Sequence, residues 1–537
     1  MPFLSCTAKI LKKHLFIALF SVVYLCFAFL TYKDYGVTYD EKVEYDAGKY
    51  LLEYSIKSTD SIYVTELINN KPDNIEYRHL PLFSTYSRVY PLLVNIINPN
   101  SYFEWFHLQN LVFGLLIFVL PYIFLYRIYG NGSKAMVGPI LIIVTGAVSG
   151  HIPANPKDIP FAIVILLALT YLSGSSKKID NTYWRILISG ILIGLSQGFR
   201  TVGATVFITY LIIETSLLIK TKAKLNEWKE YAAKTVTILI ISLFVWILLV
   251  PYLGSNFFAN FFSIVKDSSG FQNWNHEVLY NGDFYNKTER PWHYLFVYTA
   301  FQLPLIVLLP IITSIYRLLK KRVTLHPSVK YLSVFTLVNI LLYLILHPVV
   351  YNTTRHFIYL LAVLVVISAY FLIETIKLVS PRYKKYVIGV SVLYTIITVY
   401  KLATLHPYEY IYYNELIGGV RGADQRYELD YWGAAYKESA DYVVSIIEKN
   451  DLQELKVYSC DNQFAMVYYS KFKFSLIPNS RYSDIIVCDT YKEQLQKFTG
   501  DFKYDNTHTL VKSVERNGVS LNNIWVSEPL LKYFKNE

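Results

Sequence analysis

A dense acidic patch, residues 39–46, follows the first hydrophobic segment of the chain and contains Asp40, Glu41 and Glu44. On a helix, Asp40 and Glu44 would lie four residues apart on one face, where like charges repel. Carboxylates at the point where a helix leaves a bilayer are costly unless they face water or a polar ligand. The patch therefore predicts either a site in which Asp40 acts as a general base, or a solvated amphipathic helix on the membrane surface.

A proline-rich turn from His151 to Pro160 contains the pair Lys157 and Asp158. Prolines fix such a turn, and Asp158 falls where the next helix is expected to begin, a position that favours negative charge. Two interpretations stay open. Asp158 is either a helix cap, which spacing alone slightly favours, or a second acidic site residue with Lys157 as a phosphate contact.

Basic and imidazole side chains recur at three further positions: Arg200, His293 beside Arg290, and the pair Arg355–His356. Arginine binds phosphate oxygens through a planar fork of donors. A lone arginine at a membrane interface is usually an anchor whose charge reaches the water. Three such positions on one face, opposite the acidic groups, instead favour a phosphate or pyrophosphate site.

The elements that position these residues are membrane helices. The 537-residue chain is 53% hydrophobic and only 17% charged, whereas soluble domains average about 25% charged. Many apolar runs approach the ~20 residues that span a bilayer. About eleven spans are predicted, at 14–31, 105–126, 135–150, 159–174, 185–199, 202–219, 234–253, 294–316, 330–347, 356–378 and 385–403.

Charge sets the predicted orientation. The chain carries a formal net charge of +11, and Lys and Arg gather in alternate short loops. This is the bias of cytoplasmic loops rather than a sign of nucleic-acid binding. An inside N-terminus and an odd number of helices place Asp40, Lys157, Asp158, Arg200 and Arg355 together on the outer face.

Two segments are too long and polar to be connectors: a first outer loop at 32–104, and a tail at 404–537. The tail alternates strand-like and helix-like runs, which predicts a small soluble α/β domain. We therefore expect a transmembrane catalytic domain at 1–403 and an extracytoplasmic domain at 404–537. Cys460 and Cys488 lie in strand-like runs of this tail, and spacing leaves open whether they pair or stay free thiols.

The motifs together resemble the membrane glycosyltransferases of the GT-C class. The nearest resemblance is to the dolichyl-phosphate-mannose–protein mannosyltransferase-like family and its bacterial relatives, including the aminoarabinose transferases. The acidic pair Asp40–Glu41 is shared by the whole class. The runs 155–161, 406–410 and 431–433 are narrower and resemble a bacterial branch. The resemblance covers most of the chain to about residue 445.

The resemblance implies an inverting hexosyl- or pentosyltransferase. Its donor is a sugar on a polyprenyl phosphate, and its acceptor is a hydroxyl of a glycolipid, polysaccharide or protein. Asp40 matches the catalytic acidic residue of the class, Glu41 its neighbour, and Asp158 the second acidic group of many members. Lys157, Arg355 and His356 are candidates for the leaving phosphate, with Arg200 and His293 as further substrate contacts. Some class members use a divalent metal, but no motif in this chain demands a metal.

The expected location is the bacterial cytoplasmic (inner) membrane, with the N-terminus in the cytoplasm. Two other functions remain open. A transporter or flippase of a lipid-linked glycan would bind the same head groups without chemistry, but coupling charges near helix centres are sparse. A sensor or scaffold would use the tail to bind a partner.

Overall fold

The computed structural model describes residues 13–45, 101–174, 182–250, 253, 256–269, 277–286, 289–320, 324–453, 455–499 and 507–534. Most of the predicted first outer loop, residues 46–100, lies outside these ranges, as does Asp46 of the acidic patch. The loop predicted at 254–293 is described only in part.

Each of the eleven predicted apolar stretches contains helix in its described residues, and the stretches 135–150 and 294–316 are divided among shorter helices. The helices of this part of the chain are α2 (Leu15–Thr31), α7 (Tyr102–Gly114), α8 (Leu116–Tyr129), α9 (Gly132–Ala135), α10 (Val137–Val144), α11 (Gly146–Ser149), α12 (Asp158–Ser173), α13 (Thr182–Phe199), η2 (Thr201–Ala204), α14 (Thr205–Thr221), α15 (Leu225–Leu249), α17 (Phe257–Ser269), α18 (Tyr294–Gln302), α19 (Leu305–Leu319), α20 (Pro327–Leu346), η3 (Arg355–Phe357), α21 (Ile358–Leu378) and α22 (Pro381–Leu405).

Within the described ranges, six helices are long and apolar enough to cross a membrane by length and composition. They are Tyr102–Tyr129, Thr201–Thr221, Leu225–Leu249, Pro327–Leu346, Arg355–Leu378 and Pro381–Leu405. Shorter apolar helices accompany them at Leu15–Thr31, Gly132–Val144, Asp158–Ser173 and Leu305–Leu319. The chain is therefore a helical membrane protein, and the count of eleven spans stays a prediction.

Local sequence explains where several helices begin and end. Pro327 and Pro381 occupy the first helical position of α20 and α22, where a missing N–H costs nothing. Pro304 precedes α19 and separates it from α18. Gly130 ends α8 in the left-handed conformation (φ 62°) that glycine adopts readily. The predicted span 294–316 is therefore two helices with a break.

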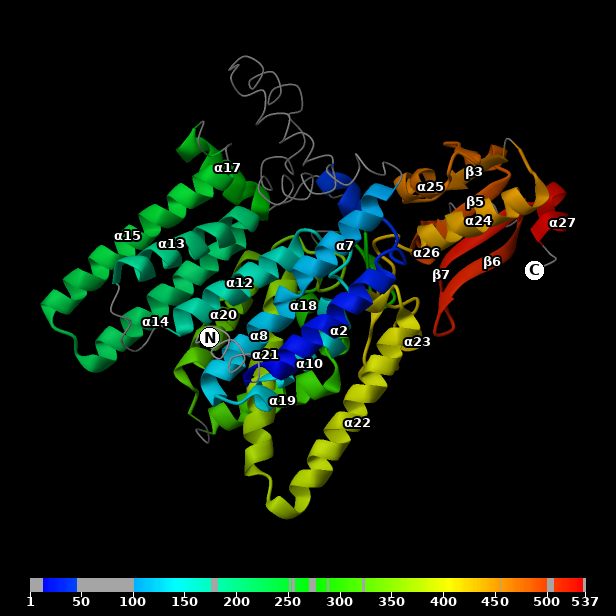
Figure 1. Ribbon diagram of the computed structural model, residues 1–537. Coiled ribbons are helices and arrows are strands. Elements are labelled where there is room, and N and C mark those ends of the chain that lie inside the picture. The colour runs from blue at the N-terminus through cyan, green and yellow to red at the C-terminus, as the bar shows by residue number, and fades with distance from the viewer. Residues whose placement is uncertain are drawn as a thin grey trace, which may run out of the picture.

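Other helices pack around α21. In the most apolar 18-residue stretch of Arg355–Leu378, 83% is buried inside the protein. Figure 1 shows α13, α14 and α15 grouped at one side of the bundle and α22 at the other. The outer helix α22 exposes Val390, Leu393 and Tyr400, each more than half exposed. Large apolar side chains without a protein partner are what a lipid-facing helix presents.

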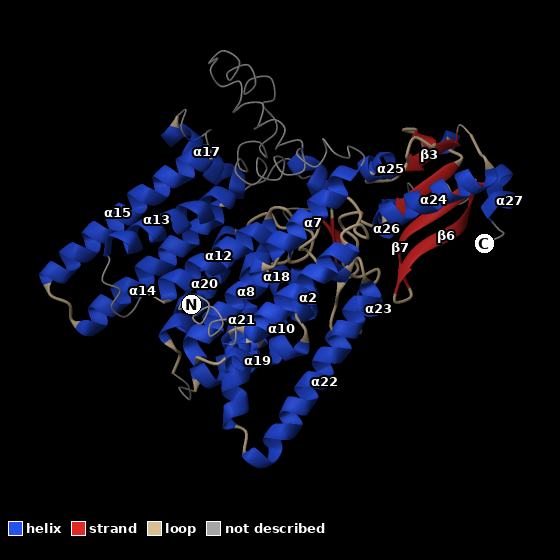
Figure 2. Ribbon diagram, viewed as in Figure 1, coloured by secondary structure: helices blue, strands red, loops and turns tan. Residues whose placement is uncertain are grey.

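Strands of the described chain gather in two places (Figure 2). A small hairpin pairs β1 (Val278–Tyr280) with β2 (Asp283–Tyr285). A five-stranded sheet, in the order β4-β3-β5-β7-β6, comprises β3 (Leu455–Ser459), β4 (Phe474–Leu476), β5 (Ile485–Asp489), β6 (His508–Arg516) and β7 (Val519–Ser527). The strands β4, β3 and β5 run parallel, whereas β7 is antiparallel to both β5 and β6.

Helices cover both faces of this sheet. The helices of the C-terminal part are η4 (Glu409–Ile411), η5 (Glu415–Ile417), α23 (Gly419–Ala423), α24 (Tyr436–Asn450), α25 (Gln463–Tyr469), η6 (Ser480–Tyr482), α26 (Thr490–Thr499), η8 (Glu528–Leu530) and α27 (Leu531–Phe534). Alternation along β5 sends Ile485 and Val487 into one core with α24, and Ile486 and Cys488 to the other face.

Strands predicted at 456–459, 485–487, 509–514 and 524–526, and helices at 435–447 and 491–498, match elements of this sheet unit. Cys460 and Cys488 form a disulfide, so of the two alternatives the structure has the paired one. The core of the membrane helices takes in tail residues up to Ala435 and also Val514, Val519 and Leu521 of the sheet unit. The core of the sheet unit takes in Val37 and three aromatic residues of α7.

Candidate active site

Asp40 lies on a short helix, residues 39–45, that follows α2. Thr38 and Glu41 form a reciprocal cap: Thr38 N–H donates to Glu41 Oε2 (2.9 Å), and Glu41 N–H donates to Thr38 Oγ1 (3.4 Å). The Tyr39 N–H donates to the Trp432 carbonyl (3.4 Å). The start of this helix is therefore held by its own side chains and by the tail of the protein.

Four charged side chains from distant segments form a chain of ion pairs. Arg355 Nη2 lies 2.6 Å from Asp40 Oδ2, and Arg355 Nε lies 3.5 Å from Asp158 Oδ2. Arg200 pairs with the other carboxylate oxygen of Asp158. Arg355 and Asp158 are nearly fully buried, whereas 20% of the Asp40 side chain and 21% of the Arg200 side chain are exposed. The sequence-predicted residues Asp40, Asp158, Arg200 and Arg355 thus meet.

The turn before α12 shows what Asp158 does. Asn155 Oδ1 accepts the backbone N–H groups of Asp158 (2.8 Å) and Lys157 (3.3 Å), so Asn155 supplies the cap. The Asp158 carboxylate instead accepts from Asn155 Nδ2 (3.1 Å) and faces the two guanidinium groups. Asp158 is thus both the acidic residue in the first turn of α12, where negative charge is favoured, and an acidic member of the cluster, so the structure fits both sequence interpretations.

Two further pairs surround the cluster. His107 Nε2 on α7 lies 2.8 Å from Glu41 Oε1, with both side chains fully buried. Lys157 Nζ lies 3.8 Å from Glu44 Oε1, and 20% of the lysine side chain is exposed. Glu41 is therefore a buried support of the short helix, whereas Lys157 keeps partial access to solvent.

His356 and His293 are placed differently. His356 is next to Arg355 in η3, and its ring packs edge-on against Tyr351 with the ring centres 4.4 Å apart. His293 lies at the start of α18, with its Nδ1 2.7 Å from the Tyr280 hydroxyl. These contacts of His293 join it to Tyr280 of the β1–β2 hairpin, not to the Asp40–Arg355 chain.

An aromatic wall from the tail covers the cluster. The Arg355 guanidinium lies 5.4 Å from the centre of the Trp432 ring, within cation–π range. His151 packs edge-on against Trp432 (4.9 Å), and its Nε2 lies 2.8 Å from the Tyr431 hydroxyl. Burial lowers the pKa of His151 to about 3, so this imidazole is neutral at physiological pH.

Comparison with known proteins gives structural likeness alone. No family model matches the chain, and no curated protein matches it. Two solved structures are similar over most of its length. ArnT from Cupriavidus metallidurans, bound to undecaprenyl phosphate, shares 11% identity and a TM-score of 0.48, covering 95% of this chain and 97% of its own. Oligosaccharyltransferase AglB from Archaeoglobus fulgidus, in complex with an inhibitory peptide and a dolichol-phosphate, shares 13% identity and a TM-score of 0.42, covering 91% and 71%. Both are GT-C glycosyltransferases.

The acidic and imidazole side chains of the site are of the kinds that bind metal ions. Among the residues that the structure describes, no group of three or more His, Cys, Asp or Glu side chains is placed to hold a metal ion. Between Asp40 and Asp158, the bridging group is the guanidinium of Arg355.

Sequence reasoning gave no role to three residues that contact the cluster: His107, Asn155 and Trp432. Signals for them exist in the sequence. His107 is a polar residue inside an apolar span, and such residues are rare without a partner. Thr38 and Glu41 have the spacing of a capping box, which would have assigned Glu41 a structural partner. Asn155 and Trp432 lie in the runs 155–161 and 431–433, which carry the narrower part of the resemblance.

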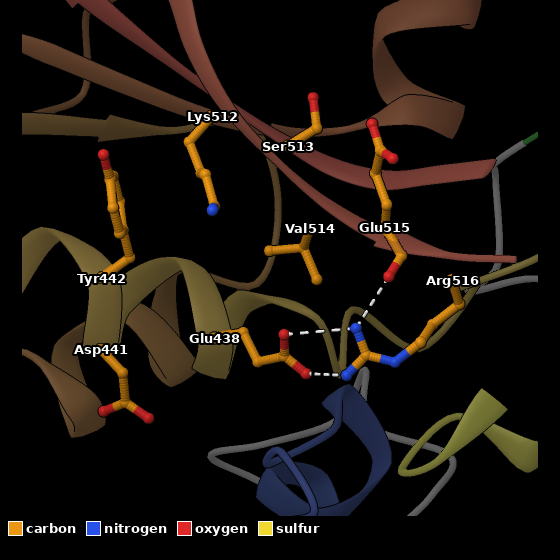
Figure 3. Close-up of a pocket in the computed structure, with 8 residues that line it drawn as sticks. All are labelled: Glu438, Asp441, Tyr442, Lys512, Ser513, Val514, Glu515 and Arg516. Carbon is orange, nitrogen blue, oxygen red and sulfur yellow. Dashed lines mark hydrogen bonds and ion pairs between the residues drawn. The ribbon is translucent and has the colours of Figure 1, made fainter. Parts of the chain in front are cut away.

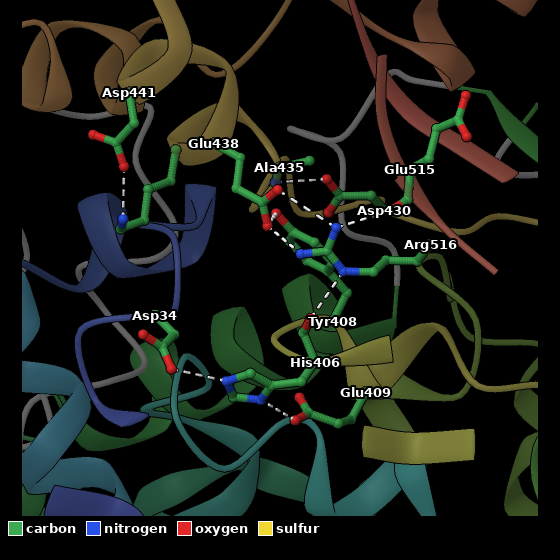
Figure 4. A network of polar contacts seen from close by, with 11 residues as sticks. Asp34, His406, Tyr408, Glu409, Asp430, Ala435, Glu438, Asp441, Glu515 and Arg516 are labelled. Carbon is green, nitrogen blue, oxygen red and sulfur yellow. Dashed lines mark hydrogen bonds and ion pairs between the residues drawn. The ribbon is translucent and has the colours of Figure 1, made fainter. Parts of the chain in front are cut away.

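Arg516 of β6 links the sheet unit to the end of α22. A groove of 540 Å³ between α24 and β6 is lined by Tyr442, Lys512 and the ion pair of Arg516 with Glu438 (Figure 3). Arg516 Nε also donates to the carbonyl of His406 (2.8 Å), and the His406 ring lies between Asp34 and Glu409 (Figure 4). One network therefore joins β6, the end of α22 and the turn after α2.

Proposed function

We propose that this protein is an inverting glycosyltransferase that moves a sugar from a polyprenyl-phosphate donor to an acceptor hydroxyl at the outer face of the membrane. The observation that carries the proposal is the chain Asp40–Arg355–Asp158–Arg200. It combines a partly exposed carboxylate with cations in a cluster at the start of α12 and α21. Phosphate-linked sugar transfer needs both a base and a positive site for the leaving phosphate.

In the proposed step, Asp40 is the general base. Its Oδ2 is held by Arg355 at 2.6 Å, so we assign Oδ1 to the acceptor hydroxyl. The carboxylate takes the hydroxyl proton as the acceptor oxygen forms a bond to the anomeric carbon. The bond from that carbon to the phosphate oxygen breaks on the opposite side, and its electron pair leaves with the polyprenyl phosphate. Attack from the opposite side inverts the configuration.

The leaving phosphate is assigned to Arg200 and Lys157. Both side chains are about one-fifth exposed, and Arg200 Nε is a buried donor without a hydrogen-bond partner among the described residues. A phosphate oxygen would satisfy that donor and displace the weak Glu44 contact of Lys157. Arg355 is bridged to two carboxylates, so we assign it to orienting Asp40, with His356 and Glu41 behind the reacting groups.

Placement at the outer face rests on two lines of support. The basic loops lie at the opposite ends of the helices from Asp40 and Arg355. The Cys460–Cys488 disulfide is typical of an oxidising compartment. We therefore propose that residues 404–537 face the outside and carry the acceptor side of the reaction. Glycolipid, polysaccharide and protein acceptors all present the required hydroxyl.

The test compares purified wild type with Asp40→Asn in release of polyprenyl phosphate from a panel of polyprenyl-phosphate sugars. Each reaction is supplied with a glycolipid, a polysaccharide or a peptide acceptor. Loss of a general base lowers rates by about 100- to 10,000-fold. We expect release with one donor in the wild type and a loss of this size in the variant, measured at a temperature at which both proteins are folded.

Asp283→Asn is the matched control, because Asp283 is an exposed carboxylate on β2 outside the cluster. It should retain wild-type release. Full activity of Asp40→Asn would remove Asp40 from the mechanism. If the folded wild type releases no polyprenyl phosphate from any donor but moves labelled lipid across proteoliposomes, the transporter function replaces the proposed one.

A further inference from the structure

The turn that precedes Arg355 is strained. Asn352 and Thr353 both have left-handed backbones, with φ of 55° and 60°. Asparagine tolerates this region, but a β-branched residue such as threonine is a genuine outlier there. A conformation of this kind persists only where the surroundings over-determine it, and it is common at functional sites. Arg355 lies two residues after Thr353, and its N–H donates to the Asn352 carbonyl at 3.2 Å.

Glu428 holds this turn from the tail. The Thr353 N–H lies 3.1 Å from Glu428 Oε2 and 3.1 Å from the Tyr294 hydroxyl, and Tyr294 itself donates to Glu428 Oε2 (3.4 Å). Glu428, Tyr294 and Thr353 are all at most 3% exposed. A buried backbone N–H without an acceptor is costly, so the carboxyl group supplies an acceptor at the most strained residue.

Glu428 is itself fixed in position. Its N–H donates to the Tyr298 hydroxyl (3.4 Å), and its carbonyl accepts from Tyr413 (2.8 Å). Four residues later, Trp432 packs on the Arg355 guanidinium and its carbonyl receives the Tyr39 N–H beside Asp40. One short segment thus contacts the Arg355 turn, the Arg355 side chain and the Asp40 helix.

We propose that Glu428 is a positioning residue of the transfer reaction: it holds the Thr353 turn in its left-handed conformation and so sets Arg355 between Asp40 and Asp158. The inference rests on the proposed function for its catalytic meaning. The alternative is that Glu428 contributes to stability alone, without any effect on how Arg355 orients the base.

Burial raises the pKa of Glu428 to about 8, against the hydrogen bonds from Thr353 and Tyr294 that favour the charged form. The side chain is therefore mostly neutral at pH 7, and Glu428→Gln keeps its shape, its charge and its carbonyl acceptor. Glu428→Ala removes this acceptor and the partner of the Tyr294 hydroxyl, which is the other acceptor of the Thr353 N–H. The conservative variant should therefore rescue what alanine loses.

The experiment measures kcat and KM for the donor in wild type, Glu428→Gln and Glu428→Ala. We expect alanine to lower kcat by about 10- to 100-fold, the cost of a small misplacement of a catalytic group, with a smaller change in KM. Glutamine should stay close to wild type. Glu493→Ala is the matched control, because Glu493 is a buried acid of the sheet unit that contacts Asn523 and Trp525; it should lower the melting temperature but not kcat.

The decisive variant adds Thr353→Gly, since glycine adopts positive φ without strain. In this background Glu428→Ala should recover most of the lost kcat and most of the lost apparent melting temperature. A wild-type kcat in Glu428→Ala, or strictly additive effects of the two substitutions, would overturn the proposal. If the wild type transfers no sugar at all, the proposed function fails, and the melting-temperature cycle still decides whether Glu428 holds the turn.

Discussion

The two ends of the helix Arg355–Leu378 carry opposite kinds of charge pairing. At its start, Arg355 is 4% exposed and bridges Asp40 and Asp158, which come from other parts of the chain. At its end, roughly 35 Å away, Lys377 pairs with Glu374 three residues earlier, and both side chains are at least one-quarter exposed. At the first end the ion pairs are buried and join distant segments. At the second end the ion pair is exposed and joins residues of one helical turn.

The difference teaches what each end is for. Exposed ion pairs contribute about 0–1 kcal/mol to stability. A buried pair is costly to desolvate, and removing one partner leaves an uncompensated charge. A protein that needed only stability would gain little from the Arg355 arrangement. Buried charges brought together from four segments instead favour a site whose geometry is the selected property.

The largest effect should come from Arg355→Met. Two buried or partly buried carboxylates lose their bridge, which costs about 3–5 kcal/mol in comparable cases. We expect a marked fall in the apparent melting temperature in detergent, together with loss of polyprenyl-phosphate release. Arg355→Lys should recover part of the stability, because it keeps the charge but not the fork of donors. A melting temperature equal to wild type in Arg355→Met would break the contrast between the ends.

An intermediate effect should come from His406, at the border of the site end. Burial lowers the pKa of His406, but hydrogen bonds and charges from Glu409 and Asp34 outweigh it and raise the pKa above 6.5. A raised folded-state pKa gives stability that is complete below the unfolded pKa and lost as pH rises through the folded pKa. The apparent melting temperature should therefore fall above pH ~6.5, by an amount equivalent to roughly 1 kcal/mol.

Two variants check this pH dependence. His406→Gln should flatten the profile above pH ~6.5, and Glu409→Gln should shift the fall toward lower pH, because it removes the nearest charge. An unchanged profile in both variants would show that the network in Figure 4 contributes no measurable stability.

The smallest effect should come from Lys377→Ala at the C-terminal end of the same helix. Its partner Glu374 keeps a hydrogen bond from the Tyr129 hydroxyl (2.8 Å). Ion pairs between residues three positions apart on an exposed helix contribute about 0.2–0.5 kcal/mol. We expect a shift in melting temperature near the limit of measurement and unchanged release. A loss as large as that of Arg355→Met would mean that the two ends do not differ as proposed.

Much of the helical architecture was predictable because each span is encoded locally. Apolar runs near 20 residues, prolines at helix starts and the alternation of basic loops are all properties of nearby residues. The same holds for the strands around Cys460 and Cys488. The break at Leu303–Pro304 was missed because a proline inside an apolar run reads equally well as a kink.

The site was predictable in its members but not in its pairings. Topology grouped Asp40, Asp158, Arg200 and Arg355 on one face, and the structure brings them into contact. Nothing local in the sequence specifies that Arg355 bridges both acids, or that Glu41 faces His107. His293 was grouped with them because it shares a loop face, yet its position is fixed by Tyr280 of the hairpin.

The bond from Asn462 to the backbone just before Asp40 has a consequence for how this chain could be recombined. Asn462 Nδ2 donates to the carbonyls of Val37 (2.9 Å) and Gly433 (3.1 Å), and the Val37 N–H donates to the Tyr469 hydroxyl oxygen (3.2 Å). The sheet unit therefore holds in place two segments next to the cluster, one at Val37 and one at Gly433. If this unit is exchanged for another in a chimaera, the new unit must also supply Asn462 and Tyr469. The end of the last membrane helix is therefore not sufficient to define the exchangeable unit.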